Sequence, residues 1–302
     1  MWADMMQHLE SWFKYPYNEW GMTLIGIGLG IAFGAFWLVG HWPPLFRKHW
    51  LWGIAVVSAF LTLLAIVFVQ IPLQTWAGDA IRHFWTQAVI TDWLFLLAIP
   101  QILVSGLVQE GAKMVPMVLW WWRSSTNITP RLGMAIGAVA GAGFGIFEAV
   151  WVHLKVFNAG WTWQAYQTDG FIAIAGFWER FFSVGFHIAA SALVGYGLAK
   201  GNGWQFYLIA AGLHALFNYI VVFYQKGMLT IVQVETYVAV FAVIITAVVF
   251  WLNRTRRGEE EINGDDSGIY EGTKEEIAAG QTVEKLISKR VVDEDENNGI
   301  EN

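Results

Sequence analysis

The chain contains no cysteine among its 302 residues, which excludes disulfide bonds, thiol catalysis and thiolate metal sites together. Charge is also scarce, because Asp, Glu, Lys and Arg make up only 14% of the residues and hydrophobic residues make up 56%. The first twenty residues lack a basic stretch followed by an apolar run, so no cleavable signal peptide is expected. The ten-residue alternation typical of transmembrane β-barrels is missing as well.

Seven continuous apolar stretches predict an all-α, polytopic membrane protein with about seven transmembrane helices in one bundle. Each stretch reaches roughly 20 residues, the length that an α-helix needs to cross a hydrocarbon core. We expect spans at 21–40, 50–71, 93–122, 132–157, 171–199, 205–224 and 231–252. These spans form a transmembrane domain at 21–252, preceded by an interfacial segment at 1–20.

Basic residues in the short loops predict the orientation. With the N-terminus outside, the cytoplasmic loops and tail would hold Arg47, Lys48, Arg123, Arg131, Lys200, Arg254, Arg256 and Arg257. The outer side would hold only Lys14, Arg82, Lys155 and Lys226. Since cytoplasmic loops carry an excess of Lys and Arg, we expect a multi-pass cell-membrane protein with its C-terminus in the cytoplasm. A re-entrant segment in the third span, which contains Pro100 and Pro116, would change this parity.

Residues 253–302 differ in composition from the rest of the chain. They are polar and carry runs of acids, so they bury too little apolar surface to fold alone, and we expect a mostly disordered cytoplasmic tail. The net charge of −6 comes from this tail and therefore does not indicate a nucleic-acid partner. Docking of a cytoplasmic partner to the tail is the alternative to a plain solvated tail.

Seven ionisable residues interrupt four successive apolar stretches. Each charge at the bilayer centre costs about 2.5–3.5 kcal/mol, so such residues indicate a functional centre. They are Glu110, Lys113, Glu148, Glu179, Arg180, His187 and His214. We expect them to form a buried polar centre.

Helical spacing relates several of these residues. Glu110 and Lys113 are three residues apart and share a face, so a purely structural ion pair is one interpretation. Glycines precede Glu148, which indicates close helix packing there. His153, five residues after Glu148, is nearer the boundary and is expected at the interface.

The fifth and sixth spans add basic and amide groups. Arg180 and His187 are two turns apart and share a face, whereas Glu179 is rotated by about 100° from Arg180. His214 and Asn218 form an i,i+4 pair that faces one neighbour.

Depth groups the residues further. At 1.5 Å per residue from the cytoplasmic helix ends, four residues lie at one level: Glu110 and His187 at about 18 Å, His214 at about 14 Å and Asn218 at about 20 Å. Glu148 lies at about 24 Å and Glu179 at about 30 Å, so Glu179 is the residue expected to pair with Arg180 near the outer face.

Two chemistries are compatible with these residues. Amide hydrolysis requires a base, for which Glu110 is available, and donors for the oxyanion, for which His187, His214 and Asn218 are available. Alternatively, a Glu with both His residues forms a three-ligand set with an open position, as catalytic zinc requires, although no HExxH motif is present.

The order of these motifs resembles the PrsW and YhfC group of intramembrane proteases. The first two motifs are QExxK at Gln109–Lys113 and the glycine run before Glu148. The next are the pair Glu179-Arg180, followed by FFSVGFH up to His187, and HALFN from His214. The resemblance covers residues from about 93 to 224, and the seven-residue step from Arg180 to His187 makes YhfC the nearer relative. That group is placed in one superfamily with the CAAX-processing/Abi proteases and the Aph-type scaffold subunit of gamma-secretase.

The resemblance implies that a glutamate-activated or metal-bound water attacks a peptide bond of a membrane protein or peptide within the bilayer. By position, Glu110 would activate the water, with Lys113 as its neighbour and Glu148 as a second acid. His187 and His214 would bind the water, a metal such as zinc, or the oxyanion, and Asn218 would supply an amide donor. The first motif departs from the PrsW pattern because Gln109-Glu110 replaces a Glu-Glu pair.

Two other classes of protein are compatible with buried Glu, His and Arg residues. A proton-coupled transporter also places such residues at the midplane, but it often shows two repeated halves, and no repeat is found here. A non-catalytic scaffold or assembly subunit of the same superfamily would keep the histidines for assembly.

Overall fold

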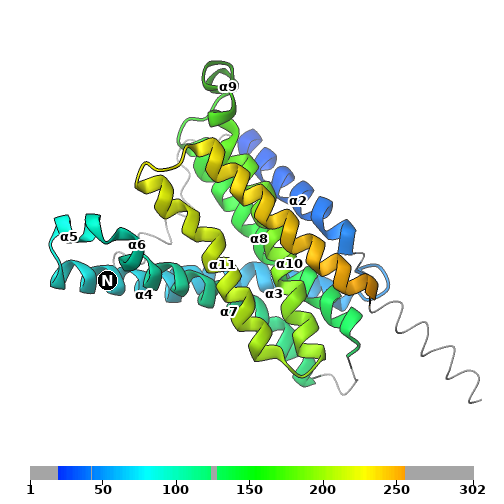
Figure 1. Cartoon of the computed structure of the whole chain (residues 1–302). Coiled ribbons are helices and arrows are strands. Elements are labelled where there is room, and N and C mark those ends of the chain that lie inside the picture. Colours follow the sequence, from blue (N-terminus) through cyan, green and yellow to red (C-terminus); the bar gives the residue numbers. More distant parts are fainter. Residues whose placement is uncertain (1–19, 42, 124–127, 256–302) are drawn as a thin grey trace, which may run out of the picture. The chain divides into compact units, whose positions relative to one another are not determined.

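The computed structural model describes residues 20–41, 43–123 and 128–255, and these residues are helical apart from short turns. The helices are α2 (Trp20–His41), α3 (Trp50–Ala65), the π-helix η1 (Ile66–Gln70), α4 (Ile71–Phe84), α5 (Gln87–Asp92), α6 (Leu94–Leu97), α7 (Ile99–Arg123), α8 (Pro130–Asn158), α9 (Trp163–Asp169), α10 (Phe171–Ala199) and α11 (Gly203–Gln225). A last helix covers Ile231–Thr255 (Figure 1). The expected interfacial segment and the acidic tail fall almost entirely outside the described residues.

Among the described residues, seven helices are long and apolar enough to cross a membrane, which confirms the all-α, polytopic fold class. Six of them match the expected spans closely. The second does not, because the helix expected to end at residue 71 continues through η1 and α4 to Phe84.

The π-helix explains this difference. Pro72 cannot donate a backbone hydrogen bond, and inside an α-helix it would normally break or kink the chain. Here the N–H of Ile71 reaches back five residues to the carbonyl of Ile66, so the widened turn at η1 accommodates the proline. Pro116, by contrast, lies inside the continuous helix α7, so the described part of the third span contains no re-entrant turn.

Helices α8 and α10 form the centre of the described bundle, with α2, α3, α7 and α11 packed around them. Their contact depends on glycines at four-residue intervals: a Cβ at Gly133, Gly137 or Gly141 would collide with a carbonyl oxygen of α10. The two backbones therefore approach closely, as small residues allow between membrane helices. This packing places His187 of α10 beside α8.

Candidate active site

Glu110 and Lys113 form the most deeply buried ion pair of the described residues. Both lie on α7, one helical turn apart, and Lys113 Nζ donates to Glu110 Oε1 at 2.6 Å. Both side chains have zero exposed surface. The attraction within a buried ion pair offsets the cost of desolvation only if further hydrogen bonds satisfy both groups, so the stability of this pair depends on its neighbours.

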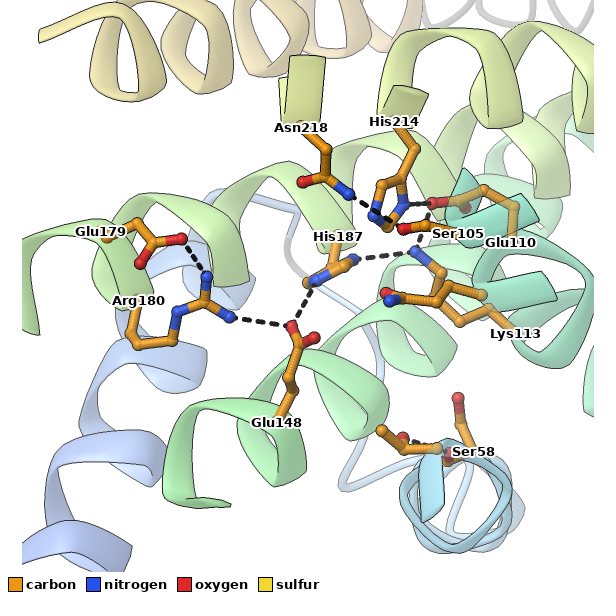
Figure 2. A network of polar contacts seen from close by, with 12 residues as sticks. Ser58, Ser105, Glu110, Lys113, Glu148, Glu179, Arg180, His187, His214 and Asn218 are labelled. Atoms are coloured by element: carbon orange, nitrogen blue, oxygen red, sulfur yellow. Dashed lines mark hydrogen bonds and ion pairs between the residues drawn. The ribbon is translucent and has the colours of Figure 1, made fainter. Parts of the chain in front are cut away.

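The two histidines complete this arrangement. His214 on α11 places Nδ1 at 2.7 Å from Glu110 Oε1, and His187 on α10 places Nδ1 at 2.9 Å from Lys113 Nζ. The ring centres of the histidines are 5.3 Å apart. Figure 2 shows the four side chains converging from three helices. The prediction that Glu110, His187 and His214 approach one another is confirmed.

The partners determine which ring nitrogens carry protons. An ammonium group is a donor only, so Nδ1 of His187 accepts from Lys113 and Nε2 carries the proton of the neutral ring. A carboxylate is an acceptor only, so Nδ1 of His214 donates to Glu110. His214 therefore leaves its Nε2 on the side away from Glu110.

His187 links this group to a second acid. Its Nε2 lies 2.9 Å from Glu148 Oε2 on α8, and the same oxygen accepts from Arg180 at 3.1 Å. Arg180 also pairs with Glu179. Side-chain exposure decreases along this chain of contacts, from 35% at Glu179 to 12% at Arg180 and Glu148 and 4% at His187. We call the set Glu110, Lys113, Glu148, His187 and His214 the polar centre.

The aromatic ring of Phe144 covers one side of the polar centre. This residue of α8 is fully buried, with Lys113 Nζ 5.1 Å from the ring centre and the His187 ring 5.2 Å away. A Cβ at Gly145 would stand 3.4 Å from the Cβ of His187. The glycine run before Glu148 thus brings α8 close enough for Glu148 and Phe144 to contact His187.

Asn218 occupies a neighbouring position. It lies one turn after His214, as predicted, but its amide donates to the hydroxyl of Ser105 on α7 at 3.0 Å. Since a carboxamide nitrogen carries two hydrogens, one donor of Asn218 remains after this bond.

His153, which the sequence places near the membrane boundary, is packed between helices. Its side chain is fully buried, its Nδ1 contacts the carbonyl oxygen of Gly26 at 3.2 Å, and its ring stacks on Phe177. Because Gly26 has no side chain, α2 can approach α8 at this point. His153 therefore belongs to the packing of α2, α8 and α10.

Several buried polar residues were not among the predicted ones. Gln70 accepts a hydrogen bond at 3.1 Å from the amide of Gln109, the residue before Glu110. Glu235 on the last helix is only 4% exposed, and its Oε2 has no hydrogen-bond partner among the described residues. Glu235 could have been found from the sequence, because it is the only acid within the seventh apolar stretch.

The polar centre includes a group that could hold a metal ion. Ligand atoms of Glu110, His187 and His214 lie within 4.8 Å of one another, and two histidines with one glutamate are a known ligand set for catalytic zinc. The ammonium of Lys113 is bonded to two of these three residues. The donor atoms thus suit a metal ion, but Lys113 must move away before one can bind.

Comparison with known proteins adds one match. A family model described as PrsW family intramembrane metalloprotease matches residues 47–249, about two thirds of the chain and all of the polar centre. No curated protein and no solved structure matches.

Proposed function

The chain belongs to the PrsW family of intramembrane metalloproteases, and we propose that it hydrolyses a peptide bond of a membrane protein with Glu110 as the water-activating residue. Its seven apolar helices and its family make it a multi-pass membrane protein with a protease role. The family match does not favour a transporter or a non-catalytic scaffold. The step from Arg180 to His187 supports a YhfC-like member within the wider superfamily.

One observation supports the role of Glu110 above the others. Its Oε1 accepts from both Lys113 and His214, whereas its Oε2 is buried without a hydrogen-bond partner among the described residues. Leaving a buried polar atom unpaired costs about 1–3 kcal/mol, so it requires an explanation. An oxygen reserved for a proton of the attacking water is such an explanation.

The proposed reaction follows from this arrangement. Glu110 Oε2 accepts a proton from water as the water oxygen bonds to the carbonyl carbon of the substrate. The carbonyl oxygen becomes an oxyanion, for which the second amide hydrogen of Asn218 and the positive charge of Lys113 are the proposed stabilisers. When the C–N bond breaks, Glu110 returns the proton to the leaving nitrogen.

The other residues of the polar centre hold these groups in place. Lys113 and His214 orient the carboxylate of Glu110 through Oε1. Glu148 orients His187 through Nε2, and Arg180 offsets the charge of Glu148. If a metal is bound, Glu110, His187 and His214 would hold it, and it would polarise the water and the carbonyl.

A cleavage assay with the Glu110→Gln variant tests the proposal. The variant keeps the shape of the side chain and removes the base, so cleavage of a co-expressed library of membrane proteins should fall by about 10²–10⁴-fold. Metal content is measured on the same purified proteins, which separates a metal-dependent from a metal-free reaction.

Glu235→Gln is the matched control, because it replaces another buried acid that lies outside the polar centre. It should retain most of the activity. Full cleavage by the Glu110→Gln protein would refute the proposed mechanism and leave Glu148 as the acid to test.

A further inference from the structure

A chain of side-chain amides begins beside Glu110 and runs away from it. Gln109 Nε2 donates to Gln70 Oε1 at 3.1 Å, Gln70 Nε2 donates to Gln74 Oε1 at 3.3 Å, and Gln74 Nε2 donates to the carbonyl of Gln101 at 2.8 Å. We call Gln70, Gln74 and Gln109 the amide ladder. It joins η1 and α4 to α7.

The ladder leads from a less buried region to Gln109, the residue before Glu110. Gln74 and Gln101 are half-buried, Gln70 is 9% exposed and Gln109 is 5% exposed. On α7, Gln101 and Gln109 are eight residues apart, or about 12 Å along the helix axis. An extended peptide covers that length with about four residues.

Two features distinguish the ladder from an ordinary structural link. Gln109 Oε1 is buried and has no hydrogen-bond partner among the described residues, so the ladder retains an unused acceptor next to Glu110. Gln70 lies in a π-helix, and single π-turns inside membrane or soluble helices are frequent at functional sites.

The proposed substrate needs groups of this kind. A transmembrane substrate is a helix whose peptide bonds are shielded, so the segment to be cleaved must first leave its helix. Each backbone N–H and C=O released in hydrocarbon costs several kcal/mol unless it finds a new partner. A carboxamide offers one acceptor and one donor group, the same combination as a peptide unit.

We propose that the amide ladder is the site that binds the backbone of an extended substrate segment and guides it to Glu110. The substrate N–H groups bond to Gln109 Oε1 and, once the Gln70–Gln109 bond opens, to Gln70 Oε1. The freed Nε2 of Gln109 donates to a substrate carbonyl. This inference rests on the proposed function. It adds that the protein recognises the unpaired backbone groups of the substrate rather than its side chains.

Binding of a defined peptide tests the proposal independently of cleavage. The probe is a dye-labelled, 20-residue Leu/Ala peptide with two central glycines, and its binding to the Glu110→Gln protein in nanodiscs is measured by fluorescence anisotropy. A second peptide carries N-methyl groups on the amides that flank the glycines. Each lost hydrogen bond should weaken binding by about 2–10-fold.

The Gln70→Met/Gln109→Met pair of substitutions keeps side-chain length and removes both amides. In that protein the unmethylated peptide should bind more weakly, and N-methylation should cause no further loss. Gln205→Met is the matched control, because Gln205 Oε1 is also buried without a partner but lies on α11, away from the ladder. The single Gln109→Met variant serves if the pair does not fold.

Equal penalties for N-methylation with and without the amides would overturn the proposal, as would equal binding of both peptides to the parent protein. Cleavage by the protein with Glu110 intact is measured separately. If the protein cleaves substrate but peptide binding does not depend on Gln70 and Gln109, only the ladder proposal is refuted. If binding depends on these residues but no cleavage is found, only the proposed function is refuted.

Discussion

Substitution of Gly141 by alanine should disable the polar centre although none of its own residues is replaced. An added Cβ at this position would collide with the carbonyl oxygen of His187 and lie 2.8 Å from the Cα of Ile188. Comfortable carbon contacts are about 3.5–4.0 Å, so α8 and α10 must separate by roughly 1 Å at this turn. The 2.9 Å contacts of His187 with Lys113 and Glu148 would then both lengthen.

The expected magnitudes follow from that displacement. A misplacement of about 1 Å can cost about 10²-fold in rate, so kcat/KM should fall by about that factor. Overpacking typically costs about 1–3 kcal/mol, which thermal denaturation in detergent would detect. Gly212→Ala is the control, because its Cβ would meet no atom within 4 Å although it lies two residues before His214. A Gly141→Ala protein with normal kcat/KM would show that this packing does not position His187.

Three further predictions concern charge and topology. Arg180→Leu leaves Glu148 without its buried counter-charge and should lower the free energy of unfolding by about 3–5 kcal/mol, whereas Arg180→Lys should lose less; unchanged denaturation midpoints would count against the ion pair. A periplasm-active reporter fused after Trp251 should be inactive and one fused after Tyr224 active, and the reverse pattern would overturn the predicted orientation. Lys113→Met removes the competing ammonium, so metal analysis should find more zinc bound than in the parent protein; equal zinc content would show that Lys113 does not occupy the metal position.

Helical periodicity and depth predicted that Glu110, His187 and His214 meet, but depth also grouped Asn218 with them and set Glu148 apart. In the structure Asn218 bonds to Ser105 and Glu148 contacts His187. Glu110, His187 and His214 lie at similar heights on three helices, and the cost of burying charge favours their convergence. The spacing of Arg180 and His187 also predicted a shared face, and both contact the same oxygen of Glu148.

The rotation of one helix about its axis relative to its neighbours was not predictable from spacing alone. The burial of His153 was not predicted for this reason, because it depends on a glycine of α2 that is 127 residues away in the chain. The π-turn at η1 was missed because its only local signal is Pro72, which more often ends a helix than widens one. Contacts of this kind are set by tertiary packing.

The replacement of the expected Glu-Glu pair by Gln109-Glu110 has a physical explanation in the structure. Gln109 donates a hydrogen bond to Gln70 Oε1, whereas an ionised glutamate at that position could only accept. A glutamate at position 109 would place a second negative charge next to Glu110. The single ammonium of Lys113 already bonds to Glu110 and His187, so it could not compensate that charge. A neutral amide avoids that uncompensated charge, and the second acid stands instead on α8, where Arg180 accompanies Glu148. Each carboxylate of the polar centre therefore pairs with a cation, although Glu148 shares Arg180 with Glu179, and His187 joins the two pairs. A Gln109→Glu substitution alone would break this balance, so two acids on α7 would require a further cation beside Gln70.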